Sequence, residues 1–120
     1  MMFLTAMNRF RKNAFANPED LPSKKMKVVL DDPDVERVRR AHLNDLENIL
    51  PFFAVGLLYC FTQPNPDTAN LLFKVFALAR IAHTLVYAVY PVRQPARFLA
   101  FAVAMGVNIY MAVAVVLYYV

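Results

Sequence analysis

The C-terminal stretch of the chain places the strongest constraint on its fold. Residues 98–120 (FLAFAVAMGVNIYMAVAVVLYYV) contain no charged side chain in 23 positions. A helix of about 20 apolar residues is long enough to cross a hydrocarbon core roughly 30 Å thick. We therefore predict a transmembrane helix at residues 96–120, and the predicted fold class is an all-α integral membrane helical bundle.

Charged residues are crowded into the first part of the chain. Residues 1–47 hold nine of the thirteen Lys and Arg and eight of the nine Asp and Glu. The whole chain is 59% apolar and 18% charged, whereas soluble domains have roughly 45–50% and about 25%, so a water-soluble globule is disfavoured. The net charge of +4 raises the question of a nucleic-acid partner. Because the charge is confined to one end, we predict no nucleic-acid binding.

Two further helices precede the last one. Residues 69–90 are long enough to span a membrane, and their Lys74, Arg80 and His83 are tolerated there if they face protein or water. A helix at 32–62 has Asp32 as a candidate N-cap and Pro33 at its first position. Proline-rich breaks at 63–67 and 91–95 are short, so consecutive helices should pack antiparallel.

The N-terminal residues do not form a complete span. Residues 1–8 are mostly apolar but too short to cross a bilayer, and we predict that they are the remnant of a first helix that is largely missing. The basic segment 9–31 is predicted to be a cytosolic loop, because cytosolic segments are enriched in Lys and Arg. Residues 1–120 are then a single membrane domain.

Polar side chains fall on one face of two predicted helices. At about 100° per residue, Arg40, Asn44 and Glu47 share a face of the helix at 32–62, and Arg80, His83 and Tyr87 share a face of the next helix. One explanation is a structural ion-pair network. The other is a site for a small anionic, glutathione-like ligand, since arginine binds carboxylates and a cation near a thiol stabilises the thiolate.

Other chemistries have little support in the sequence. The single cysteine, Cys60, excludes an intrachain disulfide. His42 and His83 are the only histidines and lie on different predicted helices, so we predict no metal site. The chain has no GxGxxG, P-loop or GxSxG motif.

Several motifs together resemble the MAPEG superfamily of small membrane proteins that act in eicosanoid and glutathione metabolism. They are FANPED (15–20), VERVRRAHLNDLENILPF (35–52), GLLY (56–59), ARIAHTLVY (79–87) and QPAR (94–97). The resemblance implies a homotrimer of four-helix subunits in the endoplasmic reticulum and outer mitochondrial membranes, with glutathione sites that face the cytosol. It also implies conjugation of glutathione, as co-substrate, to hydrophobic electrophiles and reduction of lipid hydroperoxides.

The resemblance also implies the site residues. Arg97 takes the place of the catalytic cation that stabilises the glutathione thiolate. The implied glutathione contacts are Arg9, Arg39, Arg40, His42, Asn44, Glu47, His83 and Tyr87.

Three alternatives remain open. A glutathione-dependent prostaglandin E synthase is disfavoured, because the synthase branch resembles this chain but has a serine where Phe98 stands, an arginine at Leu43 and a tyrosine at Phe101. A non-catalytic scaffold that presents lipid to a partner is disfavoured by the presence of Asn44 and Arg97 together with the other implied contacts. The third alternative is that a chain without a full first helix is inactive.

Overall fold

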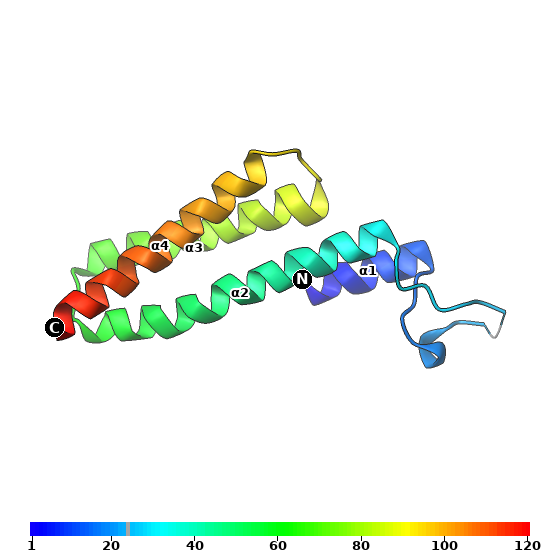
Figure 1. Ribbon diagram of the computed structural model, residues 1–120, viewed down its shortest axis with the longest axis horizontal. Coiled ribbons are helices and arrows are strands. Elements are labelled where there is room, and N and C mark those ends of the chain that lie inside the picture. Colours follow the sequence, from blue (N-terminus) through cyan, green and yellow to red (C-terminus); the bar gives the residue numbers. More distant parts are fainter. Residues whose placement is uncertain (24) are drawn as a thin grey trace. The chain divides into compact units, whose positions relative to one another are not determined.

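The structure, a computed structural model, describes residues 1–23 and 25–120. It contains the helices α1 (Met2–Lys12), α2 (Pro33–Phe61), α3 (Pro66–Thr84) and α4 (Ala96–Tyr119), together with a short 3-10 helix at Pro18–Asp20 and a π-helical turn at Leu85–Val89 (Figure 1). The described residues include no strand, and the all-α fold class is confirmed. The chain divides into two compact units, Met1–Leu43 and Asn44–Val120, whose boundary lies inside α2. The single domain expected for residues 1–120 stays a prediction.

In the first unit, α1 is longer than predicted. It runs to Lys12 instead of ending at residue 8, so the first four residues of the expected loop are helical. Asn13 ends the helix in the left-handed conformation (φ 51°), which asparagine adopts more easily than most residues. The basic residues of the last turn also suit the negative end of the helix dipole, so the change in charge at Arg9 does not mark the helix end.

The start of α2 follows from its capping residue. The Asp32 carboxylate accepts hydrogen bonds from the backbone N–H groups of Asp34 and Val35, both at 3.0 Å. This confirms the predicted N-cap. The Asp34 side chain in turn pairs with Lys12 of α1 at 2.6 Å and with Arg37 at 2.7 Å. Hydrogen bonds from these two cations hold the pKa of Asp34 below its ordinary value.

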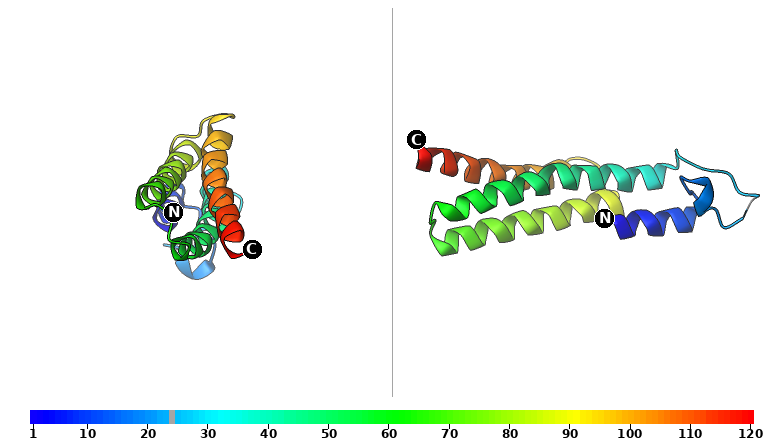
Figure 2. Two further views of the ribbon diagram at one scale, coloured as in Figure 1. Left: turned by 90° about the vertical axis from the view of Figure 1, so that its left-hand side faces the viewer. Right: turned by 90° about the horizontal axis from the view of Figure 1, so that it is seen from below.

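The second unit is a three-helix bundle made of residues 44–61 of α2 with α3 and α4. α3 and α4 run antiparallel and pack against each other, as the short loop between them predicted (Figure 1). Figure 2 shows the same helices from two further sides. The Phe52 ring stacks on the Phe76 ring with 3.8 Å between centroids. The buried core residues are Tyr59, Phe76, Ala79, Ala104, Val107 and Met111.

Two helical segments are long and apolar enough to cross a membrane. Pro66–Val89 and Ala96–Tyr119 have 24 residues each, and the best windows have mean hydropathies of 1.5 and 2.2. Only 28% and 22% of these windows are buried, whereas the core helix of a soluble domain would be mostly covered. Their exposed surface is mostly apolar, as expected of helices in contact with lipid. Lys74 of α3 is an exception, since its side chain is exposed, whereas Arg80 and His83 are buried.

α3 begins three residues earlier than predicted. The Asn65 side chain accepts hydrogen bonds from the N–H groups of Asp67 and Thr68, at 2.9 and 3.3 Å. Pro66 therefore occupies the first helical position, which suits its fixed φ and missing N–H. The proline-rich segment that suggested a longer break in fact contains the start of the helix.

Candidate functional site

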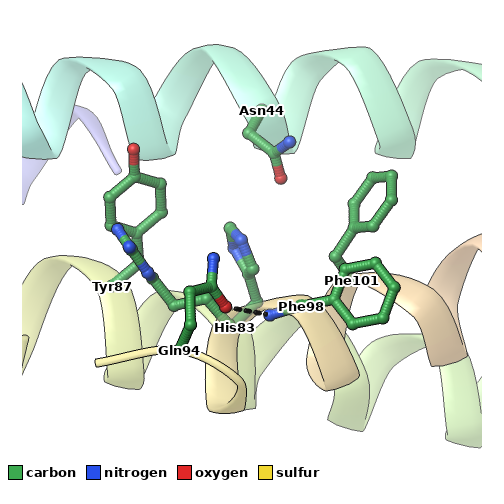
Figure 3. A pocket seen from close by; sticks show the side chains of 7 residues that line it. Asn44, His83, Tyr87, Gln94, Phe98 and Phe101 are labelled. Atoms are coloured by element: carbon green, nitrogen blue, oxygen red, sulfur yellow. Dashed lines mark hydrogen bonds between the residues drawn. The ribbon is translucent and has the colours of Figure 1, made fainter. Parts of the chain in front are cut away.

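The second unit contains an open cavity of about 330 Å³ between its helices. α2, α3 and the π-helical turn each contribute one side chain to the wall of this cavity. The α3–α4 loop and the first turns of α4 contribute the others. The lining residues are Asn44, His83, Tyr87, Gln94, Arg97, Phe98 and Phe101 (Figure 3).

One side of the cavity combines a cation with two aromatic rings. The Arg97 guanidinium carbon lies 4.6 Å from the centroid of the Tyr87 ring, within the range of a cation–π interaction. The His83 ring meets the Tyr87 ring edge-on, with 5.4 Å between centroids and 87° between planes. Arg97 Nε is buried and has no hydrogen-bond partner among the described residues. The guanidinium therefore keeps donor capacity for a ligand.

Tyr87 lies in the π-helical turn that follows α3. In this turn the backbone hydrogen bonds join residues five positions apart instead of four, as in the 2.7 Å bond from the Tyr90 N–H to the Leu85 carbonyl. The sequence predicted a helix over residues 69–90 without distinguishing its type, and the structure shows π-helical hydrogen bonds in its last part. A π-helical turn changes the angular position of each side chain within it, and such turns occur frequently at functional sites.

The segment before α4 positions the other polar side chains of the cavity. The Gln94 side-chain oxygen accepts a hydrogen bond of 3.2 Å from the backbone N–H of Phe98, which supports the first turn of α4. Arg97 lies in that same turn. Since the start of a helix carries a partial positive charge, the helix dipole and Arg97 both favour an anion here.

A buried ion pair lies behind the cavity wall. Arg80 and Asp45 are 5% and 6% exposed, and Arg80 Nε donates to Asp45 Oδ1 at 3.1 Å while Nη2 contacts the same oxygen. Thr84 donates to the other Asp45 oxygen at 3.3 Å. Arg80 does not line the cavity. The sequence grouped Arg80 with His83 and Tyr87 as a possible ligand-binding face, and in the structure Arg80 binds a carboxylate of the protein instead.

Arg80 also contacts two side chains of the cavity wall. Its Nη2 donates to Asn44 Oδ1 at 2.9 Å and lies 3.2 Å from His83 Nδ1. The Arg80 guanidinium, which lies outside the cavity, therefore contacts both Asn44 and His83 of the cavity wall.

The predicted site residues are distributed over both units. The cavity brings together Asn44, His83, Tyr87 and Arg97. Glu47 belongs to the same unit, is exposed on α2 and is not among the lining residues. The first unit holds Arg9, Arg39, Arg40 and His42. Their role as glutathione contacts stays a prediction, as does that of Glu47.

The residues of the first unit have partners or exposure of their own. Arg9 donates to the Ala14 carbonyl at 2.8 Å. Arg39 pairs with Glu36 at 2.6 Å. Arg40 is exposed and His42 is partly buried.

Sequence reasoning missed four residues of the site. Phe101 follows Arg97 by one helical turn, so helical spacing could have placed it on the same face. Both Phe98 and Phe101 were considered only as departures from the synthase pattern. Gln94 carried no signal beyond its position before a helix. Asp45 could have been found from the need of a buried arginine for a carboxylate partner.

A bundle with two membrane-length helices and a cationic, aromatic cavity beside the α3–α4 loop defines a small helical membrane protein with a site suited to an anion. The chain belongs to the MAPEG family, whose profile matches residues 1–117. It is 49% identical to microsomal glutathione S-transferase 1 of Homo sapiens over an alignment of 117 residues, covering 93% of this chain and 75% of the relative. The Mus musculus protein of the same name is 49% identical over 120 residues, covering 93% and 77%. Prostaglandin E synthase of Equus caballus is 48% identical over 102 residues, covering 84% and 66%.

Proposed function

We propose that this chain is a membrane glutathione transferase that conjugates glutathione to hydrophobic electrophiles and reduces lipid hydroperoxides with it. The observation that carries the proposal is the Arg97 guanidinium, held over the Tyr87 ring in a cavity that Asn44 and His83 also line. The relatives named for glutathione transfer support the same activity.

Arg97 stabilises the reactive form of glutathione. An unperturbed thiol has a pKa of ~8.5 and is mostly protonated at neutral pH, and each unit of lowering corresponds to about 1.4 kcal/mol of preference for the thiolate. A guanidinium at the start of α4 supplies positive charge for this purpose without a metal ion. Asn44 and His83 bind polar groups of the glutathione backbone.

The chemistry needs no nucleophile from the protein. With an aryl halide, the thiolate sulfur forms a bond to the ring carbon and the halide leaves with the bonding electrons. With a lipid hydroperoxide, the thiolate sulfur forms a bond to the terminal oxygen and becomes a sulfenic acid, the O–O bond breaks, and the lipid alkoxide leaves and takes up a proton to give the alcohol. A second glutathione then gives the disulfide and water.

The hydrophobic substrate approaches along the aromatic part of the cavity wall. Phe98 and Phe101 stand together at one side of the cavity and Tyr87 at the other (Figure 3). Phe98 is 59% exposed, on a helix whose outer surface is apolar and suited to lipid. An electrophile dissolved in the bilayer would thus reach the thiolate without passing through bulk water.

The remaining elements of the proposal rest on the family resemblance. Arg9, Arg39, Arg40, His42 and Glu47 complete the glutathione contacts in a homotrimer. The site faces the cytosol, and the protein resides in the endoplasmic reticulum membrane and the outer mitochondrial membrane.

The test uses the whole chain in detergent micelles or lipid nanodiscs. Calorimetric titration measures glutathione affinity, and ultraviolet absorbance of the bound thiolate measures its ionisation. Conjugation of an aryl halide and reduction of a fatty-acid hydroperoxide measure turnover. Saturable glutathione binding with thiolate formation and both activities is expected. Absence of glutathione binding would overturn the proposal.

A glutathione-dependent prostaglandin isomerase is the second candidate function. The similarity to prostaglandin E synthase over 84% of the chain favours it. Supplying the same preparation with a prostaglandin endoperoxide separates the two, because a transferase would show little isomerisation beside rapid aryl halide conjugation. A chain that binds lipid but lacks both activities would be the scaffold.

A further inference from the structure

We propose that Arg80 is a positioning residue that orients the hydrogen-bonding groups of Asn44 and His83, so that both present N–H donors to the cavity. The inference rests on the proposed function for the identity of the ligand, but the orientation itself can be tested without any ligand.

The argument starts from the chemistry of guanidinium. Arginine has five N–H donors and no acceptor, so a group that hydrogen-bonds to Arg80 does so as an acceptor. Arg80 Nη2 lies 3.2 Å from His83 Nδ1. Nη2 has two hydrogens and three neighbouring acceptor atoms, Asp45 Oδ1, Asn44 Oδ1 and His83 Nδ1, which share its N–H groups. An N–H at His83 Nδ1 would face these donors and be repelled, so the imidazole proton is on Nε2.

The same reasoning orients the amide of Asn44. Arg80 Nη2 donates to Asn44 Oδ1 at 2.9 Å. A reversed amide would point its N–H₂ group at a donor, which is repulsive, so the oxygen faces Arg80 and the nitrogen is available for other partners. No acceptor for this nitrogen is found in the part of the chain that the structure describes.

Asp45 fixes Arg80 in this position. The carboxylate accepts from Arg80 Nε at 3.1 Å and also contacts Nη2, while Thr84 holds its second oxygen. Both charged residues are more than nine-tenths buried. Two guanidinium nitrogens bound to one carboxylate oxygen limit the rotation of Arg80, and one of them, Nη2, is also the nitrogen that lies next to Asn44 and His83. Nη1 is buried and has no hydrogen-bond partner among the described residues.

The result is a cavity wall made of donors. Asn44 Nδ2, His83 Nε2 and the Arg97 guanidinium all offer N–H groups, and Asn44 and His83 line the cavity with Arg97. A wall of donors favours ligands rich in acceptors and negative charge. The carboxylates, peptide carbonyls and thiolate of glutathione fit this requirement, and a cationic ligand does not.

The first experiment determines the His83 tautomer by nitrogen-15 NMR of the ligand-free chain in micelles. The His83 signal is assigned from its loss in His83→Gln, which leaves His42 as the only histidine. A neutral ring protonated at Nε2 is expected. A ring protonated at Nδ1, or at both nitrogens, would overturn the inference.

The second experiment changes the donor character of residue 80. Arg80→Lys keeps a side chain with donors only, so the Nε2–H tautomer should persist and glutathione affinity should fall only slightly. The double variant Asp45→Asn/Arg80→Gln keeps a neutral hydrogen-bonded pair but has an amide that can accept as well as donate. It should give a mixture of His83 tautomers and bind glutathione about tenfold more weakly.

His83 itself provides an independent check. The terminal nitrogen of Gln can replace the imidazole Nε2–H, whereas Asn can imitate only the Nδ1 position. His83→Gln should therefore retain more glutathione affinity than His83→Asn. Equal losses in the two variants would count against an Nε2–H donor.

Asn108→Leu is the matched control for general loosening of the bundle. Asn108 is buried in the same unit and donates to the Asn48 carbonyl at 3.2 Å, but it contacts neither Arg80 nor His83 through a hydrogen bond. It should leave the tautomer and glutathione affinity unchanged even if the unfolding temperature falls. Equal loss of affinity in this control and in the double variant would overturn the positioning role.

An Nε2–H tautomer in a chain without glutathione affinity would overturn the proposed function and still support the role of Arg80.

Discussion

The Arg97 guanidinium carbon lies 4.6 Å from the centre of the Tyr87 ring. The two residues come from the π-helical turn after α3 and the first turn of α4, on opposite sides of the proline-containing loop. A cation–π contact of this kind contributes roughly 0.5–2 kcal/mol, and it orients the one arginine in the cavity wall. The geometry of the loop thus decides where the positive charge is presented.

Replacing Arg97 with alanine should raise the pH at which aryl halide conjugation becomes fast. Turnover at pH 7 should fall by about tenfold or more, since an unperturbed thiol with a pKa of ~8.5 is only a few per cent ionised there. Arg97→Lys should recover part of the loss, because it keeps the charge but not the planar fork. The measurement is the pH profile of turnover with bound-thiolate absorbance. An alanine variant with the parent's profile would exclude Arg97 as the thiolate partner.

Two substitutions of Tyr87 separate the effect of its ring on turnover from the effect of its hydroxyl group. Tyr87→Phe keeps the ring under Arg97 and should retain the parent's pH profile, with weaker glutathione binding if the hydroxyl contacts the ligand. Tyr87→Leu removes the cation–π contact and should lower turnover by roughly two- to thirtyfold. Similar profiles for Phe and Leu variants would show that the ring does not orient Arg97.

Glu47→Gln tests a residue that lies outside the cavity wall of the isolated chain. Glu47 is exposed on α2, so the substitution should leave the unfolding temperature in the absence of glutathione unchanged. If Glu47 completes the glutathione site, affinity should fall about tenfold through loss of a charge-assisted contact. A lower unfolding temperature with unchanged affinity would instead favour the structural ion-pair network.

The Asp34 cluster predicts a pH-dependent contribution to stability. Lys12 and Arg37 lower the pKa of Asp34, so its contribution is present above the ordinary carboxyl value of ~3.9 and is lost as pH falls through the lowered folded value. Asp34→Asn should therefore reduce the unfolding temperature slightly at pH 7 and not at strongly acidic pH. Because the ion pairs of Asp34 with Lys12 and Arg37 are partly exposed, the difference in unfolding temperature between parent and variant should also shrink in high salt. A difference independent of pH would contradict this account.

The chain should remain with membranes after washes with alkaline carbonate and high salt. Two helical segments of 24 residues with little buried surface need lipid around them, whereas a protein held only by its basic residues would be released by salt. Fractionation with a soluble control protein measures this. Recovery of most of the chain in the supernatant would argue against membrane-spanning helices.

The amino-acid sequence by itself determined that α2, α3 and α4 form, although not every helix end. The charge-free run at 98–120 required a long apolar helix, and α4 covers Ala96–Tyr119. Asp32 predicted the start of α2 through its side-chain cap. Both signals are local, since hydropathy, helical spacing and capping depend on residues within a few positions of one another. Asn44, His83 and Tyr87 were found from such spacing and from the family resemblance.

Tertiary structure alone decided the role of Arg80. Helical spacing placed Arg80 on one face with His83, but Asp45 lies 35 residues away in the chain and meets Arg80 only when α2 and α3 pack. In the low-dielectric interior of the bundle an unpaired guanidinium is strongly unfavourable, so Arg80 pairs with the Asp45 carboxylate and not with a ligand. Gln94 and Phe98 line the cavity because the α3–α4 loop reverses the chain direction and brings the start of α4 beside the end of α3. Such pairings depend on distances between helices, which the order of residues along one helix does not contain.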